Sequence, residues 1–172
     1  LGFKLQSYTQ ATYRNANVAF SLSGNNNAVS ANDIKFSMDK MNITGVAGGT
    51  FKDDGNIYEI QLAADTLNLD NYLPNDKKSQ DFMSMLKSEI QNLSFLKWIT
   101  LHANLQAENL IFRNAAMTEA SLQIETEEES GKLHVVEASA ENMYNTDFKL
   151  SADVENLGSL DISFANLKFD VQ

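Results

Sequence analysis

The stretch Ile99-Thr100-Leu101-His102-Ala103-Asn104-Leu105-Gln106-Ala107 decides the fold class of this chain. Apolar and polar residues alternate at every step, so a β-strand formed by it carries one apolar and one polar face. The same alternation recurs in residues 18–22, 34–38, 58–64, 120–124, 148–154, 160–164 and 167–171. Roughly ten to twelve such segments fit between the turn-forming stretches, and the pattern therefore predicts a mainly β protein.

Short polar or glycine-containing stretches separate many of these segments, at residues 24–27, 53–56, 129–132 and 156–159. Connections this short join antiparallel strands, because a parallel crossover needs about a dozen residues or more. We therefore expect one large, strongly twisted, mostly antiparallel sheet, a meander that is groove-like or half-open. The glycines at 45, 48 and 49 predict a bulge or a bend within one of its strands.

One segment departs from the alternation and predicts a helix over about residues 79–93. Its apolar residues recur at the spacing of an amphipathic helix: Phe82, Met85, Leu86, Ile90 and Leu93. Asn75 or Ser79 supplies an N-cap oxygen, and Pro74 ends the strand before it. We expect this helix to be inserted between two β halves and to lie on the apolar face of the sheet.

A short pattern of one alanine, two polar residues and an apolar residue begins at Ala31, Ala64, Ala107 and Ala140. Read as a repeat, it predicts a strand, a kink or tight corner, and the next strand. A β meander rich in alanine and asparagine would also produce such matches without any repeat. Both interpretations stay open.

Length and charge restrict what the chain can be. Its 172 residues fit a single β-rich domain over residues 1–172, and its start at Leu1 suggests a fragment of a longer protein. Lys and Arg number 13 against 23 Asp and Glu, for a net charge of −10, which argues against nucleic-acid binding and docking on anionic headgroups. The chain has no cysteine, which excludes disulfides and thiolate chemistry.

The sequence contains no recognisable catalytic or metal-binding motif. His102 lies on the polar side of its strand, and a hydrolase using it would need a pocket that converges on it. Residues 53–56 have calcium-loop residue types without the calcium-loop spacing, and residues 125–129 predict a solvated hairpin tip. We therefore expect a protein that is not an enzyme, with no cofactor and no metal.

The apolar face itself is the remaining candidate for function, because a wide sheet must cover that face. One interpretation is a closed sandwich that binds nothing. Before any family resemblance is considered, the residues favour this sandwich over an open groove. The other is a partly open groove that holds lipid chains, since each buried methylene contributes about 0.8 kcal/mol.

The stretch Leu67-Asn68-Leu69-Asp70-Asn71-Tyr72-Leu73-Pro74 resembles the "L-x-L-D-x-Y-L-P" segment of the bacterial AsmA family. Residues 36–51 are similar to the family's strand pair before a glycine-containing turn, and residues 101–110 to a later strand. Residues 120–144 are similar to the family's ending, although Asn145 and Thr146 stand where the family has glycines. The resemblance spans about residues 30–155, with Tyr72 and Pro74 as fold markers.

This resemblance implies an envelope-biogenesis protein with its β body in the periplasm, attached to the inner membrane through a segment outside this chain. Its β groove would hold or pass phospholipid acyl chains, and other envelope proteins are possible partners. The family has no catalytic residues to transfer. The implied lipid-contacting residues are the inward side chains of the matched strands: Ile60, Leu62, Leu67, Leu69, Leu101, Leu105, Leu110, Phe112, Leu122 and Ile124.

Two further expectations accompany this assignment. Phe95 and Trp98 follow the predicted helix and would line a groove mouth or anchor the core. The alternative function is a structural or protein-docking β-sandwich module of an envelope protein, with no ligand.

Overall fold

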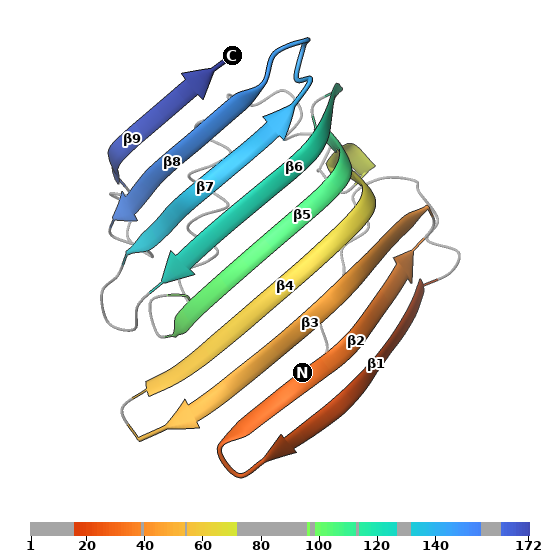
Figure 1. Ribbon diagram of the computed structural model, residues 1–172, viewed down its shortest axis with the longest axis vertical. Helices are drawn as coiled ribbons and strands as arrows, with labels where there is room; N and C mark the ends of the chain where they lie inside the picture. The colour runs from red at the N-terminus through yellow and green to blue at the C-terminus, as the bar shows by residue number, and fades with distance from the viewer. Residues whose placement is uncertain are drawn as a thin grey trace.

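The computed structural model describes residues 16–38, 40–53, 55–71, 96, 99–112, 114–126, 132–155 and 163–172. These residues form one open sheet of nine strands that follow one another in sequence order (Figure 1). The strands are β1 (Ala16–Asn25), β2 (Ala28–Met38), β3 (Met41–Lys52), β4 (Gly55–Asn68), β5 (Thr100–Phe112), β6 (Ala115–Thr126), β7 (Leu133–Glu141), β8 (Phe148–Glu155) and β9 (Ser163–Val171). The prediction of a mainly β fold with a large, mostly antiparallel, half-open sheet is confirmed.

Seven of the eight neighbouring strand pairs are antiparallel, as the short connections predict. The exception is β4–β5, which is parallel and which no local pattern of the sequence predicted. The chain between these two strands, from Leu69 to Ile99, is long enough for a parallel crossover. A 3-10 turn, η1 (Leu69–Asn71), opens this connection. The helix predicted over residues 79–93, together with Tyr72, Pro74, Phe95 and Trp98, lies outside the described residues.

Side chains hold the predicted turn at residues 24–27 and a second turn that was not predicted. The Asn25 side-chain oxygen accepts hydrogen bonds from the backbone N–H groups of Asn27, at 2.8 Å, and Ala28, at 3.0 Å, in the β1–β2 turn. This local bond is the reason that asparagine is favoured in such turns. After β4, the Asp70 carboxylate accepts a hydrogen bond of 2.8 Å from the backbone N–H of Asn114, which ties η1 to the β5–β6 turn.

The bulge that the glycines predicted lies in the neighbouring strand. β3 pairs with β4 in unbroken register through all three glycines. The register shift instead occurs in β2, where Asp33 adopts a φ of 52° opposite the segment of β3 between Gly45 and Ala47. Similar left-handed residues accompany the register shifts at Glu119 in β6 and Asn166 in β9. Because of the last shift, residues 163–171 form one bent strand instead of belonging to two.

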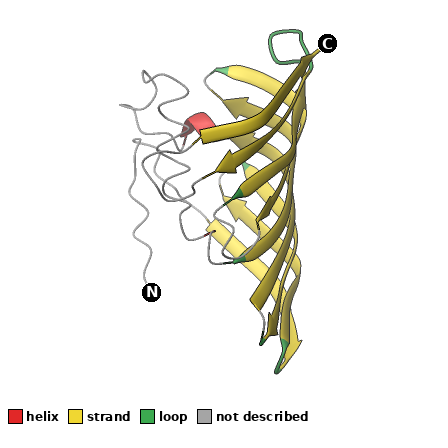
Figure 2. Cartoon of the chain, turned by 90° about the vertical axis from the view of Figure 1, so that its left-hand side faces the viewer, coloured by secondary structure: helices red, strands yellow, loops and turns green. Residues whose placement is uncertain are grey.

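The repeated alanine pattern marks a kink or strand end at only two of its four occurrences. β4 and β5 continue through it in unbroken register, with Ala64 directly opposite Ala107. At the other two occurrences, β7 ends at Glu141, directly after Ala140, and the pattern at Ala31 contains the β2 bulge. Ala64, Ala107 and Ala140 instead belong to one buried cluster. In the side view the sheet is twisted and curved, with one concave side (Figure 2).

Candidate functional site: the concave apolar face

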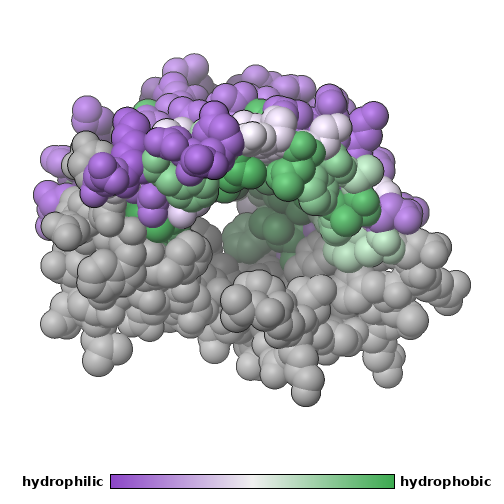
Figure 3. Space-filling view, turned by 90° about the horizontal axis from the view of Figure 1, so that it is seen from below, coloured by the Kyte–Doolittle hydropathy of each residue, from purple (hydrophilic) through white to green (hydrophobic). Residues whose placement is uncertain are grey.

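The strand register aligns apolar side chains in rows that each cross eight of the nine strands. One row, from β1 to β8, consists of Leu22, Ala31, Ala47, Ile60, Ala103, Ile124, Val135 and Ala152. A second row, from β2 to β9, consists of Ile34, Gly45, Leu62, Leu105, Leu122, Ala138, Leu150 and Phe169. Directly opposite residues project from the same side of a sheet, so both rows lie on one face, here called the inner face. Figure 3 shows hydrophobic residues lining the hollow of the curved sheet and hydrophilic residues on its outside.

Two buried clusters lie on the inner face. The first contains Leu101, Ala103, Leu133 and Val154, and Leu96 packs into it from outside the sheet. The second is built mainly of alanines, with Met117 as its largest buried member. Between and around these clusters the larger side chains remain half-buried. The inner face is therefore a packed surface at its centre, with larger hydrophobic side chains left partly accessible.

Most of the residues predicted to contact lipid lie on this face. Ile60 and Ile124 share the first row. Leu62, Leu105 and Leu122 are neighbours in the second. Five of these residues, on β4, β5 and β6, thus form one continuous patch.

The other predicted residues lie at the margins of this patch. Leu101 is buried in the first cluster, and Leu67, Leu110 and Phe112 pack against the second. Leu69 is placed differently from the prediction, because it begins the 3-10 turn η1 after the sheet strand has ended. The alternating pattern could not reveal where β4 stops.

The sequence-based assignment missed the two ends of the inner face. Val18, Phe20 and Leu22 on β1 are 64%, 55% and 68% exposed. Phe169 and Val171 on β9 are 58% and 52% exposed. Both sets lie in alternating segments, and for the β1 set the absence of any charged residue in residues 16–25 is a further signal that could have identified it.

The outer face carries both histidines of the chain in one polar row. Glu59, His102, Glu125, His134 and Asp153 lie directly opposite one another across β4 to β8. The Asp153 carboxylate accepts a hydrogen bond of 2.5 Å from the Asn166 side-chain amide and lies 2.7 Å from His134 Nδ1. These two contacts hold the pKa of the Asp153 carboxyl below its ordinary value.

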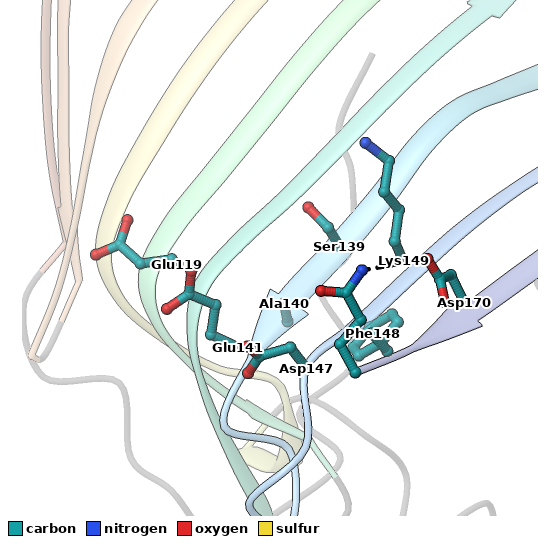
Figure 4. Close-up of a pocket in the computed structure, with 9 residues that line it drawn as sticks. Glu119, Ser139, Ala140, Glu141, Asp147, Phe148, Lys149 and Asp170 are labelled. Carbon is teal, nitrogen blue, oxygen red and sulfur yellow. Dashed lines mark hydrogen bonds between the residues drawn. The ribbon is translucent and has the colours of Figure 1, made fainter.

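A cavity of about 210 Å³ opens between the ends of β6 to β9 (Figure 4). Carboxylates dominate its lining, which consists of Glu119, Ser139, Ala140, Glu141, Asp147, Phe148, Lys149, Asp170 and Gln172. Lys149 forms an ion pair with Glu137, and this hydrogen-bonded pair lowers the pKa of the Glu137 carboxyl. The Ser139 hydroxyl lies 3.0 Å from that of Ser121, so it is paired with another hydroxyl and not with an imidazole. Within the described ranges, no group of three or more His, Asp or Glu side chains is arranged to hold a metal ion.

The acidic segment predicted as a solvated hairpin tip begins inside the sheet. Thr126 is fully buried at the end of β6, and its hydroxyl donates a 2.8 Å hydrogen bond to the Ile99 carbonyl. The same hydroxyl accepts a 3.1 Å bond from the Leu101 backbone N–H. Glu125 belongs to the polar row between the two histidines. The prediction is therefore wrong for residues 125 and 126, and residues 127–129 lie outside the described part.

Asp65 closes the end of the β3–β4 ladder with its side chain. The carboxylate accepts hydrogen bonds from the Asn42 backbone N–H, at 2.9 Å, the Asn42 side-chain amide, at 2.6 Å, and the Thr66 backbone N–H, at 2.5 Å. These bonds, led by the Asn42 N–H, hold the pKa of the Asp65 carboxyl below its ordinary value.

This lowered pKa predicts an acid-dependent contribution of Asp65 to stability. The folded state binds the Asp65 proton less readily than the unfolded chain, so the carboxylate stabilises the fold above the ordinary carboxyl pKa of about 4. That contribution disappears as the pH falls through the lowered folded-state pKa. We expect Asp65→Asn to lower the Tm at neutral pH, and the gap from the wild type to close below about pH 4. Thermal unfolding followed by circular dichroism across this range checks it; a pH-independent gap would contradict it.

Comparisons with protein-family models, with curated protein sequences and with solved structures find no match for this chain. Among the described residues, no helix has the length and apolar character needed to cross a membrane.

Proposed function

We propose that this chain is a non-enzymatic module that holds or passes lipid acyl chains on its inner face. We further propose, from the resemblance of residues 30–155, that it is an AsmA-like envelope-biogenesis protein. Its β body would then lie in the periplasm, attached to the inner membrane through a segment outside this chain. The observation that carries the lipid proposal is the single open sheet with its hydrophobic rows on the concave side (Figure 3).

The dimensions of the inner face suit an acyl chain. Nine strands at a spacing of about 4.8 Å give a face roughly 38 Å wide between β1 and β9. This width exceeds the ~30 Å hydrocarbon core of a bilayer, which two acyl chains span end to end. An acyl chain laid across the strands would contact the half-buried Leu62, Leu105 and Leu122 side by side. Each methylene removed from water there contributes about 0.8 kcal/mol.

The absence of basic residues from the central rows also supports an acyl chain over a headgroup as the bound part. The five-residue patch on β4, β5 and β6 is apolar, and the chain carries a net charge of −10. An anionic headgroup would therefore gain little by entering it. In this arrangement the acyl chain is held and the headgroup stays in water.

A fluorescent fatty acid titration with an inward and an outward variant tests this proposal. Leu105→Glu places a carboxylate in the middle of the patch, and we expect it to weaken binding at least tenfold, because the charge loses solvation beside a hydrocarbon. Asn104→Glu is the matched control, since Asn104 is the exposed outward neighbour on the same strand. It should bind as the wild type does.

Native mass spectrometry of the purified protein supplies the second measurement. We expect the wild type to retain a co-purified lipid and Leu105→Glu to lose it while keeping the β-sheet circular dichroism spectrum. If the wild type carries no lipid and takes up no fatty acid, the lipid proposal fails. The structural or protein-docking module is then the function that β1 and β9, the two edges of the described sheet, favour.

A further inference from the structure

The edge strand β1 carries neither the charges nor the proline by which proteins protect sheet edges, although its pairing with β2 shifts register between Ala19 and Ser21. It is ten residues long, and it contains no charged residue and no proline. Every one of its residues is exposed, including the large apolar Val18, Phe20 and Leu22. Natural edge strands are usually short, charged, bulged away from neighbours or covered, because unpaired N–H and C=O groups recruit other strands. Among the described residues, no strand pairs with the outer edge of β1, and all of its side chains are exposed.

The opposite edge, β9, presents a complementary strand. Phe169 and Val171 are exposed on the inner face, where Phe169 ends the second apolar row. Because β4–β5 is the one parallel pair among the nine strands, β1 and β9 run in opposite directions (Figure 1). A second copy placed edge to edge in the same orientation would therefore bring its β9 antiparallel to β1, with both inner faces on the same side.

In one pairing register between β1 of one copy and β9 of another, the exposed apolar side chains of the two strands lie opposite one another. Placing Val171 of one copy opposite Val18 of another also places Phe169 opposite Phe20, because both strands alternate with a period of two. On the outer face this register sets Asp170 against Ala19 and Lys168 against Ser21. Like charges do not meet at these positions, and the exposed apolar side chains of both edges are covered together.

We propose that this chain associates end to end with further copies of itself, through β1 of one copy and β9 of the next. The contact is heterologous, since the two surfaces differ, so each dimer keeps one free edge of each kind and can grow. Growth would continue the inner face from copy to copy. This assembly goes beyond lipid binding and does not require it.

A symmetric β1–β1 dimer explains less of the structure. It would cover Val18, Phe20 and Leu22 but leave Phe169 and Val171 exposed. The β1–β9 contact covers both sets. Its strength should rise with salt, because copies that carry a net charge of −10 repel one another and the uncharged β1 adds no attraction of its own.

Cysteine cross-linking tests the register directly, since the chain has no cysteine of its own. Val18→Cys and Val171→Cys are mixed under mild oxidation, and we expect a disulfide-linked dimer that contains one of each. Leu22→Cys mixed with Val171→Cys is the control, because residue 22 lies four positions along β1, roughly 13 Å from residue 18. That mixture should stay unlinked.

Two cross-linking results would overturn the proposal. One is the absence of a disulfide in the first mixture. The other is efficient linkage of Val18→Cys with Leu22→Cys, which would indicate β1–β1 pairing. Each variant oxidised alone measures the background of random collisions.

Sedimentation velocity gives the independent measurement. We expect the wild type to associate with increasing concentration and with salt, and Phe20→Lys to weaken this association at least tenfold. Val46→Lys is the matched control, because Val46 is 42% exposed on the outer face of the interior strand β3. A monomeric wild type at all concentrations and salt levels, or an equal effect of both variants, would overturn the proposal.

Discussion

Replacing Gly45 with alanine is expected to lower the free energy of unfolding by about 3 kcal/mol or more. A Cβ atom at this position would lie 2.0 Å from the Gln61 carbonyl oxygen and 2.9 Å from Leu62 Cδ2. The first of these atoms is backbone and belongs to the paired strand β4, so it can move only if β3 and β4 separate. Close-packed interiors accommodate such a displacement poorly. Gly45 lies in the second apolar row, and the change would therefore also disturb the proposed lipid-binding face.

Gly48→Ala is the matched control on the same strand. Its Cβ would meet nothing closer than the Val29 carbonyl oxygen, at 3.6 Å, which is an ordinary contact. We expect a change of less than about 1 kcal/mol, since alanine also reduces the freedom of the unfolded chain. Urea denaturation followed by circular dichroism measures both variants. Similar losses at the two positions would show that the approach of Gln61 is not what requires glycine at position 45.

Replacing Thr126 with valine is expected to cost about 2–4 kcal/mol, although the two side chains have nearly the same shape. The substitution removes the acceptor of the Leu101 N–H and the donor to the Ile99 carbonyl. Both backbone groups would then be left without these bonds around a fully buried side chain. Each buried polar group that loses its partner costs about 1–3 kcal/mol.

Thr126→Ser separates the hydroxyl from the methyl group. Serine keeps both hydrogen bonds and loses one buried methyl group, for which we expect about 1 kcal/mol. Chemical denaturation gives the free energies, and hydrogen exchange of the Leu101 amide should accelerate in the valine variant only. If valine is tolerated as well as serine, the two hydrogen bonds do not hold β5 and β6 together at this end.

The strands were predictable because their signal is local. In a segment such as residues 99–107, the alternation of side chains is a property of the strand itself and does not depend on its neighbours. The turn at Asn25 was predictable for the same reason, since the side chain bonds to backbone groups two and three residues away. Most of the predicted lipid-contacting residues lie on the inner face because the alternation assigns them to one side of each strand.

Several features could not be read from local patterns. The role of Gly45 depends on the carbonyl of Gln61 in the next strand, and the bulge opposite it lies in β2. Thr126 looked like part of an acidic hairpin tip, yet its hydroxyl bridges groups on either side of Thr100, far away in sequence. Leu69 continues the alternating pattern, but the chain has already turned into η1.

The sequence by itself determined that this chain forms amphipathic strands joined largely by short turns, because side-chain alternation and turn chemistry act over a few residues. Only the tertiary structure decided which strands pair, in which direction and in which register. The single parallel pair β4–β5 sets the opposite directions of the two edges, and the register lines up the apolar rows across nine strands. Pairing of this kind depends on contacts between distant segments, whose energies no short stretch of sequence contains.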